Sequence, residues 1–277
     1  MKICVIGLGF VGNAIYTSFI TKGFRENIDI FGYDKYKNGG IGNIKDCLTT
    51  DIIFLALPTP FNNSISSYEL NAINECCTYF SENNYSGIIV IKSTIEPHTI
   101  IQLENTFDNL EFLHNPEFLS ARTALEDFTN QKHIVLGKGL KCSIEKFDMV
   151  KNFYLKYFPN AKISECTCLE SECMKIFLNC FYAVKVQFFT ELYLICEKNS
   201  CDFNKIKDMM LENNWINPMH TNIPGPDGKI SYGGMCFPKD TNALNEYMKR
   251  LDTPNQILES CIKERNNLRD DNDNCNN

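Results

Sequence analysis

Features that define whole classes of proteins are absent from this 277-residue chain. No apolar run reaches the roughly 20 residues that a membrane-spanning helix needs, and no signal peptide is visible, because Lys2 leads directly into a β-type run. The basic residues form no long run and the formal net charge is −7, which argues against nucleic-acid or anionic-membrane binding. We therefore expect neither a membrane nor a nucleic acid among its partners.

Metal-binding and disulfide patterns are also missing, although cysteine is abundant. The 14 cysteines are scattered rather than paired in a framework, and a thiol that takes part in catalysis must stay reduced, so we expect a cytoplasmic protein. Cys166, Cys168 and Cys173 lie close together, but no histidine or second CxxC accompanies them. Because structural zinc needs four spaced ligands, we expect no metal site.

The first positive signal is a glycine turn that directly follows an apolar run. The run from Lys2 to Ile6 leads into Gly7-Leu8-Gly9-Phe10-Val11-Gly12, and a helix is predicted from about residue 11 to 22. Gly7 allows the turn, Gly9 lets a pyrophosphate approach the backbone, and Gly12 lets the helix pack on the strand. The N–H groups at the helix start, around Phe10 and Val11, bind phosphate in such folds.

An acidic residue about 20 positions further on completes a dinucleotide-binding pattern. Asp34 stands at the end of a second apolar run, residues 28–33, where its carboxylate would accept hydrogen bonds from ribose hydroxyls and repel a 2′-phosphate. The sequence therefore predicts NAD rather than NADP. Lys35, which follows directly, adds a positive charge that weakens this preference.

Periodicity predicts a two-domain α/β protein, since the chain exceeds the usual single-domain size of about 100–150 residues. A Rossmann-type doubly wound parallel sheet is expected over residues 1–165, followed by an all-helical domain over 166–268. Residues 269–277 form a polar, acidic tail with too little apolar surface to fold, so we expect disorder there. The predicted strands are residues 2–6, 28–33, 52–57, 87–92, 111–114 and 133–136.

A long helix is predicted from about residue 169 to 198, because this stretch contains neither proline nor glycine. Lys175 and Asn179 are four residues apart, so both side chains lie on one side of the helix and can reach the same ligand. An apolar face at helical spacing is expected to be core, and it comprises Met174, Phe177, Phe181, Val184, Phe188 and Leu192.

Three loops at the predicted strand ends carry polar or proline-rich clusters. Ligands bind at the carboxyl ends of parallel strands, so the shared position of these loops favours a site there. The clusters are Pro58-Thr59-Pro60, Lys92-Ser93-Thr94 and Asn115-Pro116-Glu117-Phe118.

A candidate nucleophile lies near the C-terminal end, in Gly233-Gly234-Met235-Cys236-Phe237-Pro238-Lys239-Asp240. The two glycines allow a close approach of backbone and substrate, and Lys239 supplies positive charge that favours the Cys236 thiolate. Asp240 could hold a water or orient the lysine. A cysteine in such surroundings differs from an ordinary buried one.

With these motifs the chain resembles the UDP-glucose 6-dehydrogenase group of nucleotide-sugar dehydrogenases, from Met1 to about Asn266. The resemblance implies an NAD-dependent, four-electron oxidation of a sugar C6 alcohol to a carboxylate, from UDP-glucose to UDP-glucuronate, and a place in polysaccharide biosynthesis. Cys236 would attack the intermediate aldehyde, giving a thiohemiacetal and then a thioester that water releases as the acid. A homodimer built on the central helices is also implied.

The resemblance assigns roles to further residues. Lys175 and Asn179 would stabilise the developing oxyanion. Asp240 and Thr94 would hold a water, and Glu117 would be the base for thioester hydrolysis. The implied substrate-binding residues are Glu117, Phe118, Leu119, Lys175, Asn179, Gly225, Tyr232 and Gly233. The implied cofactor-binding residues are Gly7, Gly9, Phe10, Val11, Gly12, Asp34, Lys35, Pro58, Thr59, Thr94 and Lys239.

Departures from the family pattern leave alternatives open. Ala121 stands where the family usually has a ligand-contacting glutamate, the segment 215–230 differs so that Asn222 and His220 are candidates only, and the third nucleotide-binding domain is missing. The alternative functions are a dehydrogenase of another nucleotide sugar, of the GDP-mannose or UDP-hexosamine type, and a non-catalytic NAD-binding dimerisation module.

Overall fold

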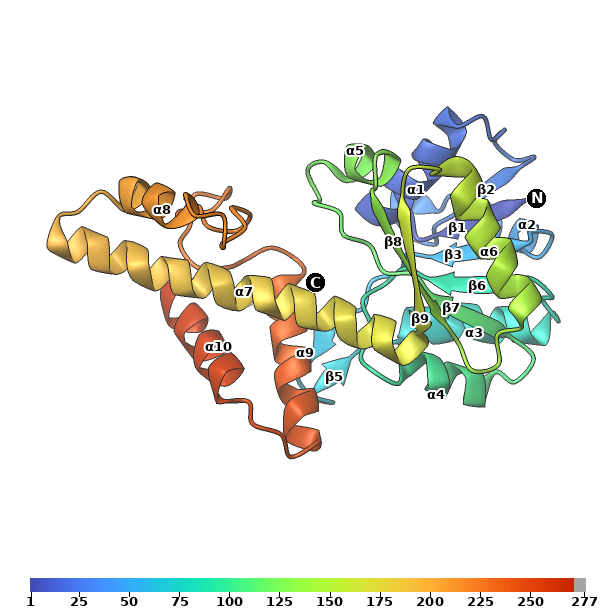
Figure 1. The fold of residues 1–277 in the computed structure, drawn as a ribbon. Helices are drawn as coiled ribbons and strands as arrows, with labels where there is room; N and C mark the ends of the chain where they lie inside the picture. Colours follow the sequence, from blue (N-terminus) through green and yellow to red (C-terminus); the bar gives the residue numbers. More distant parts are fainter. Residues whose placement is uncertain (272–277) are drawn as a thin grey trace. The chain divides into compact units, whose positions relative to one another are not determined.

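The computed structural model of the chain describes residues 1–271; the remainder of the expected tail, residues 272–277, lies outside the described residues. The chain forms two compact units (Figure 1). The first unit comprises residues 1–59 and 69–175, and the second comprises residues 60–68 together with the chain from Ile176 onward. The division therefore lies ten residues later than the expected boundary at 165, and a short segment from the N-terminal half belongs to the second unit.

A seven-stranded sheet forms the centre of the first unit, in the order β2-β1-β3-β6-β7-β8-β9. All six predicted strands are present, but β9 was not predicted. The expected doubly wound, mostly parallel sheet is confirmed: pairing is parallel except between β7 and β8, which run antiparallel. The strands are β1 Ile3–Ile6, β2 Ile30–Tyr33, β3 Ile52–Leu55, β6 Ile88–Ile91, β7 Glu111–His114, β8 His133–Lys138 and β9 Lys162–Thr167.

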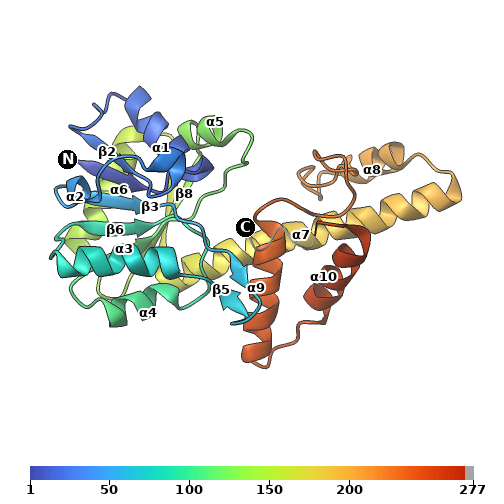
Figure 2. The same cartoon turned by 180° about the vertical axis from the view of Figure 1, so that it is seen from behind.

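Helices cover both faces of this sheet, which explains why its inner strands are continuous apolar runs. β1, β3 and β6 are buried along their whole length. One face packs against α1 Phe10–Thr21, α5 Ala124–Thr129 and α6 Ile144–Tyr157. The other packs against α2 Ile44–Cys47, α3 Asn71–Glu82 and α4 Thr99–Thr106, as Figure 2 shows from behind.

Helices dominate the second unit, as predicted. Its core contains Ala183, Phe189, Phe203, Tyr232 and Cys261. The helices are α7 Cys168–Asn199, which begins in the first unit, α8 Phe203–Leu211, α9 Phe237–Arg250 and α10 Gln256–Leu268. A two-stranded antiparallel hairpin, β4 Phe61–Asn62 and β5 Ser67–Tyr68, packs beside α9 and was not predicted (Figure 2).

The expected core face of α7 is only partly correct. Phe177, Phe181 and Phe188 are about half exposed, at 49%, 61% and 53%. The buried positions of this helix in the second unit include Cys180 and Ala183 instead. The helix carries apolar residues on more than one side, so helical spacing alone cannot tell which side faces the core.

Three further findings concern the chain as a whole. Arg269 and Asp271 form an ion pair, so the expected disorder does not begin at residue 269. Paired charges hold these residues in place, although the segment has little apolar surface to bury. Cys4 and Cys47 form a disulfide between β1 and α2, whereas no disulfide framework was expected. Within residues 1–271, no helix has both the length and the apolar character required to cross a membrane.

Candidate active site

The glycine turn of the first unit has the geometry of a close backbone approach. Gly7 has a φ of +84°, which side-chain-bearing residues rarely adopt. A Cβ on Gly12 would lie 1.8 Å from the Gly7 carbonyl oxygen, so strand and helix can touch only because residue 12 has no side chain. Around Gly9, by contrast, a Cβ would meet no atom within 4 Å. The turn therefore has open space in front of Gly9.

The start of α1 is suited to an anion. Gly9 caps the helix without a side-chain hydrogen bond, and the first turn contains no acidic residue. The first N–H groups of a helix have no partner within the helix, and they attract negative charge. Open space at Gly9 and these N–H groups together fit a pyrophosphate. The residues present therefore suit a dinucleotide.

Asp34 lies beside the glycine turn, as the pattern predicts. Its carboxylate accepts hydrogen bonds from the backbone N–H of Leu8 at 2.8 Å and of Lys37 at 2.9 Å. Desolvation raises the pKa of Asp34, but the hydrogen bonds from Lys37, Leu8 and Tyr36 outweigh it and leave the pKa below its ordinary value. The carboxylate is thus charged at neutral pH and can accept a further hydrogen bond.

The two lysines near Asp34 differ in direction. Lys35 extends away to form an exposed ion pair with Glu75, at 2.6 Å. Lys37 donates from its amine to the Leu8 carbonyl at 2.5 Å, so its charge lies at the glycine turn. Sequence reasoning named Lys35 and missed Lys37, because spacing does not reveal which side chain folds back over the turn.

The first two strand-end loops meet in the first unit. The Thr59 hydroxyl donates to the Thr94 carbonyl at 2.7 Å, and the Ser93 hydroxyl donates to the Leu57 carbonyl at 2.6 Å. These bonds tie the loop after β3 to the loop after β6, and the two strands are neighbours in the sheet. Thr94 is half-buried and Pro58 is exposed.

The third loop, after β7, meets the start of α7 within the same unit. The Lys175 amine lies 2.5 Å from the Glu117 carbonyl oxygen and 3.5 Å from the Glu117 carboxylate. The Leu119 N–H donates to that carboxylate at 2.5 Å. The Phe118 ring lies 5.5 Å from the Lys175 amine and stacks on His133. A base and a cation predicted from separate motifs are therefore direct neighbours.

Buried polar residues hold the loop after β7 in place. The Lys92 amine and the Tyr154 hydroxyl both donate to the Asn115 side-chain oxygen, at 2.7 and 2.5 Å. Burial lowers the pKa of Lys92 to about 7. His114 is also buried, bonded to Ser171, and burial lowers its pKa to about 3, so its ring is neutral.

In the second unit, Asp240 is the centre of a buried cluster. Its side chain is fully buried and accepts hydrogen bonds from Asn179 at 2.6 Å, from Lys239 at 2.5 Å and from the Tyr68 hydroxyl. The Lys239 amine also lies 4.4 Å from the centre of the Tyr68 ring. Two residues predicted from the sequence, Asn179 and Lys239, thus donate to one carboxylate. Tyr68, which was not predicted, donates to it as well.

Cys236 occupies the N-cap position of α9 and is half-buried. Pro238 lies in the first helical turn, where its missing N–H costs nothing. Cys236 thus stands where the first N–H groups of a helix attract negative charge, and Lys239 follows in the first turn of α9. The position suits a reactive thiolate.

The segment before α9 carries the remaining candidates. Tyr232 is buried, whereas Gly225 and Gly233 are half-buried. His220 packs against the rings of Tyr182 and Phe237, at 4.6 and 5.3 Å, so it serves packing in this structure. The Asn222 side chain accepts a hydrogen bond from Lys207 at 2.7 Å.

Two family models match the chain, and both describe the same family. Residues 42–157 match the NAD binding domain of the UDP-glucose/GDP-mannose dehydrogenase family, and residues 169–267 match its central domain. The chain belongs to the UDP-glucose/GDP-mannose dehydrogenase family. The cofactor predicted from the glycine turn, NAD, is the one named for this family domain.

Individual relatives agree with the family. The chain is similar to UDP-glucose 6-dehydrogenase of Rickettsia bellii, with 30% identity over 90% of this chain and 56% of that protein. The fold is similar to a UDP-glucose dehydrogenase of Pyrobaculum islandicum, with a TM-score of 0.81, 21% identity, and coverage of 96% and 68% of the two chains. It is also similar to UDP-D-ManNAc dehydrogenase of Pyrococcus horikoshii, with a TM-score of 0.77, 17% identity and coverage of 97% and 69%. The chain thus spans just over half the length of the first relative.

Within this family member, sequence reasoning missed Tyr68 and Lys92. Lys92 belongs to a quoted motif, but its burial and its bond to Asn115 follow only from tertiary structure. Tyr68 stands more than 170 residues before its partner Asp240, and nothing in its neighbourhood marks it.

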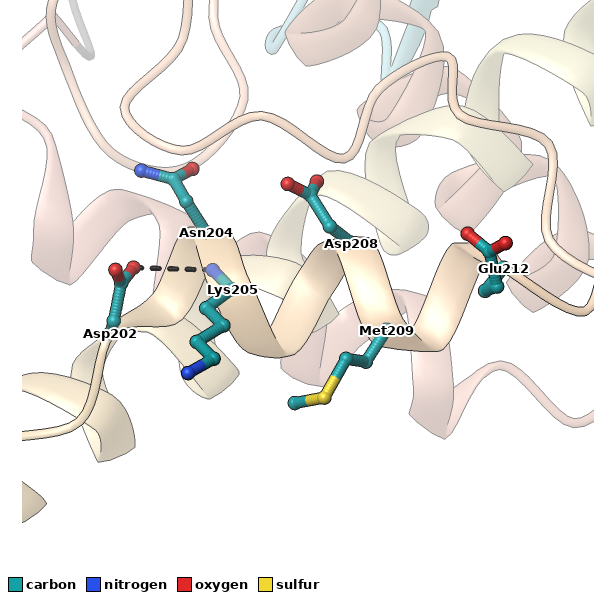
Figure 3. A pocket seen from close by; sticks show the side chains of 6 residues that line it. All are labelled: Asp202, Asn204, Lys205, Asp208, Met209 and Glu212. Atoms are coloured by element: carbon teal, nitrogen blue, oxygen red, sulfur yellow. Dashed lines mark hydrogen bonds between the residues drawn. The ribbon is translucent and has the colours of Figure 1, made fainter.

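One surface pocket lies apart from all of these residues. It follows one side of α8, has a volume of about 730 Å³, and is lined by Asp202, Asn204, Lys205, Asp208, Met209 and Glu212 (Figure 3). Mostly acidic and amide side chains line it, and Asp202 uses its carboxylate to cap α8 through the Lys205 N–H. The pocket contains none of the candidate residues, so we do not assign the active site to it.

Proposed function

We propose that this chain is an NAD-dependent oxidoreductase that oxidises the C6 alcohol of a nucleotide sugar, UDP-glucose, to the carboxylate. The observation that carries the proposal is the cluster at the start of α9. Asn179 and Lys239 meet on the buried Asp240 carboxylate, one helical turn after the half-buried Cys236. A nucleophile, hydrogen-bond donors and a carboxylate are the groups that aldehyde oxidation through a thioester requires.

The proposed reaction begins with removal of the C6 hydroxyl proton and of a hydride. Bound NAD would accept a hydride in each of the two oxidations. Asp240 and Thr94 would hold the water that takes the proton. Lys175 and Asn179 would donate to the oxygen as negative charge develops on it, which is worth roughly 3–4 kcal/mol for one well-placed donor.

Cys236 would carry the second half of the reaction. Its thiolate adds to the aldehyde carbon, forming a C–S bond and a thiohemiacetal oxyanion. Loss of the second hydride leaves a thioester, and water activated by Glu117 then cleaves the C–S bond to give the carboxylate and the thiol. The Lys175 amine, 3.5 Å from the Glu117 carboxylate, would stabilise charge in this step.

We also propose the binding roles expected from the motifs. The turn at Gly7, Gly9 and Gly12 and the carboxylate of Asp34 would bind the dinucleotide, in keeping with the open space at Gly9. The segment containing Gly225, Tyr232 and Gly233, with Phe118 and Leu119, would contact the sugar nucleotide. A cytoplasmic location is part of the proposal, because Cys236 must stay reduced.

The test is the number of NADH molecules formed for each UDP-glucose consumed by purified protein. Two NADH support the four-electron reaction. One NADH, with aldehyde as product, contradicts it. Turnover of another nucleotide sugar in place of UDP-glucose would correct the substrate, and NAD binding without turnover would favour the non-catalytic module.

Cys236→Ser separates the proposed mechanism from a simple alcohol dehydrogenase. We expect it to abolish release of the acid, while Cys201→Ser, at an exposed cysteine of the same unit, leaves acid formation unchanged. Undiminished acid formation by Cys236→Ser would overturn the thioester mechanism.

We further propose a homodimer formed through α7. Phe177, Phe181, Phe188 and Ile195 follow one another at helical spacing and are 49–61% exposed in the single chain. A row of large apolar side chains on one helix is typical of an interface. Phe181→Asp should therefore give a monomer in light scattering. If the wild type is itself a monomer, so that the variant has the same mass, the proposal is overturned.

A further inference from the structure

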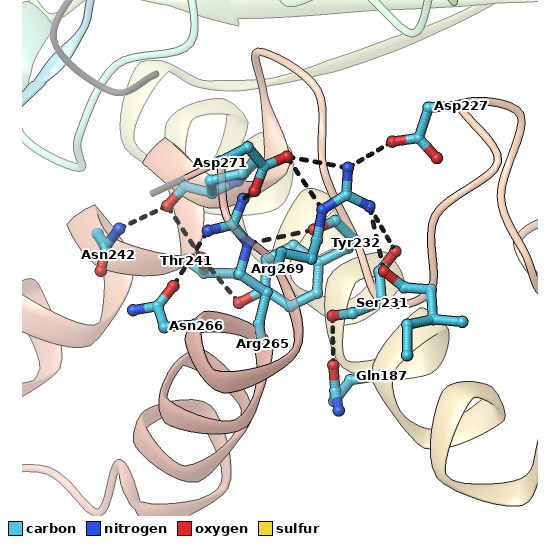
Figure 4. A network of polar contacts seen from close by, with 12 residues as sticks. Gln187, Asp227, Ser231, Tyr232, Thr241, Asn242, Arg265, Asn266, Arg269 and Asp271 are labelled. Atoms are coloured by element: carbon cyan, nitrogen blue, oxygen red, sulfur yellow. Dashed lines mark hydrogen bonds and ion pairs between the residues drawn. The ribbon is translucent and has the colours of Figure 1, made fainter. Parts of the chain in front are cut away.

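The segment from residue 212 to 236, which leads to Cys236, contains neither helix nor strand. Its backbone polar groups must therefore find partners outside regular secondary structure. Three consecutive carbonyl groups, those of Ile230, Ser231 and Tyr232, find them in two arginine side chains at the end of α10 (Figure 4). Two side chains thus supply the donors for one short stretch of backbone.

Arg269 makes most of these contacts. Its Nη1 donates to the carbonyl oxygens of Ile230 and Ser231 at 3.2 and 3.1 Å, and its Nη2 pairs with the Asp227 carboxylate. Arg265 donates from Nε to the Tyr232 carbonyl at 3.2 Å, and its guanidinium lies 5.9 Å from the centre of the Tyr232 ring. Both arginines are about 95% buried, at 5% and 4% exposure.

Asp271 connects the two guanidinium groups. Its carboxylate lies 2.5 Å from Arg265 Nη2 and 3.0 Å from Arg269 Nε (Figure 4). Desolvation raises the pKa of Asp271, but the hydrogen bond from Arg269 and the charge of Arg265 outweigh it and hold the pKa below its ordinary value. Two buried positive charges are thus compensated, which their burial requires.

Gly233 packs directly on this network. A Cβ at residue 233 would lie 2.4 Å from Arg269 Nη2 and 2.6 Å from Arg269 Cζ. At Gly234, which has a φ of +77°, a Cβ would meet no atom within 4 Å. The first glycine of the pair therefore serves the contact with Arg269, and the second serves the turn into α9.

We infer that Arg269, supported by Arg265 and Asp271, is a positioning residue that fixes the segment 227–233 and thereby the approach to Cys236. The inference rests on the proposed function, because it assigns the network to the proposed nucleophile. A guanidinium suits the task, since its planar fork supplies several fixed donors from different nitrogen atoms at once, whereas a lysine amine donates from a single atom.

Trypsin tests the fixing of the segment without any substrate. Lys229 is exposed and directly precedes the first held carbonyl. In Arg269→Ala, we expect cleavage after Lys229 to be faster by about tenfold or more, because loss of several charge-assisted bonds increases the opened population. Arg250→Ala, at an exposed arginine of α9, is the matched control and should leave that cleavage rate unchanged.

Kinetics test the consequence for catalysis. Arg269→Ala should lower kcat for NADH formation by about 100-fold, the size expected when a reacting group is displaced by about 1 Å, with the KM for NAD unchanged. Added guanidinium ion should restore part of the kcat in this variant and not in Arg250→Ala. An unchanged kcat, or a loss that guanidinium does not reverse, would overturn the positioning role.

A double-mutant cycle gives a second, independent measure. Gly233→Ala should raise the rate of cleavage after Lys229 in the wild type. In Arg269→Ala it should change that rate very little, because the new methyl group then occupies space that the guanidinium has left. Gly234→Ala should have the same effect with and without Arg269. Equal additivity at both glycines would contradict the proposed contact, and the Gly233→Ala single variant replaces Arg269→Ala if the latter does not fold.

The outcomes separate the two proposals. If the wild type forms no NADH, the proposed function fails, and the cleavage rate after Lys229 still decides whether Arg269 fixes the segment. If the wild type is active and cleavage in Arg269→Ala is unchanged, the positioning inference fails alone.

Discussion

In the first unit, the candidate side chains follow neighbouring strands of one sheet, whereas those of the second unit come from segments far apart in the sequence. Glu117 and Thr94 stand just after β7 and β6, which pair directly. Asp240 is bonded to residues at positions 68, 179 and 239. A parallel sheet brings strand ends together by its topology alone, while the second unit must rely on individual side-chain bonds.

The largest difference should appear when the central carboxylate of each unit is removed. Asp240→Ala should reduce the free energy of unfolding by about 3–5 kcal/mol, since it leaves the partly buried Lys239 without its counter-charge and the buried Asn179 without its acceptor. Glu117→Ala should cost less, about 1–3 kcal/mol, because Lys175 keeps its bond to the Glu117 carbonyl. Denaturant unfolding measures both, with the exposed-pair variant Glu246→Ala as control. Equal losses would remove the contrast between the units.

The hairpin contact should give the next effect. Tyr68→Phe removes one hydrogen bond to a buried carboxylate and should lower the free energy of unfolding by about 1.5–3 kcal/mol. Asp240 keeps the donors Asn179 and Lys239, so we expect a smaller loss than for Asp240→Ala. A loss as large as that of Asp240→Ala would show that the hairpin, not the ion pair, holds the cluster.

The glycine turn offers a comparison inside the first unit. Gly12→Ala should destabilise the fold by about 1–3 kcal/mol through overpacking against Gly7. Gly9→Ala should leave stability unchanged but weaken NAD binding by about tenfold or more, because its methyl group enters the space meant for the pyrophosphate. Thermal unfolding and calorimetric NAD titration distinguish the two. Unchanged NAD affinity in Gly9→Ala would argue against binding of the pyrophosphate at Gly9.

The smallest effects should come from pH. Burial lowers the pKa of His114 to about 3, so its contribution to stability is lost as pH falls below 6.5, the ordinary histidine value, where the unfolded chain takes up the proton. Burial raises the pKa of Glu172 to about 7, so its contribution is present at low pH and is lost as pH rises through 7.

Between pH 7 and 6 the two groups should therefore act in opposite directions, each by about 0.7–1 kcal/mol. Against the wild type, His114→Asn should become relatively more stable as pH falls, and Glu172→Gln relatively less stable. Unfolding curves at the two pH values measure this. If the free energy of unfolding changed with pH in both variants as it does in the wild type, neither group would titrate in that range.

Three features could be predicted from the sequence, because each depends on residues close together in the chain. They are the glycine turn, the strands before the candidate loops, and the shared face of Lys175 and Asn179. β9 and the hairpin were missed, since short strands carry little periodic signal. The exposed face of α7 was misjudged, since an all-round apolar helix does not show which side is covered. Tyr68, Arg265 and Arg269 could not be placed, because their partners are fixed only by the tertiary fold.

The hairpin of residues 61–68 has a consequence for how the chain can be made and divided. It is synthesised between two elements of the first unit, yet it packs beside α9, which leaves the ribosome some 170 residues later. A fragment beginning at Ile176 would therefore lack a piece of its own unit, including the Tyr68 hydroxyl that donates a hydrogen bond to Asp240. During synthesis the hairpin has no partner until α9 has been made, so the second unit can complete its folding only after α9 has been translated.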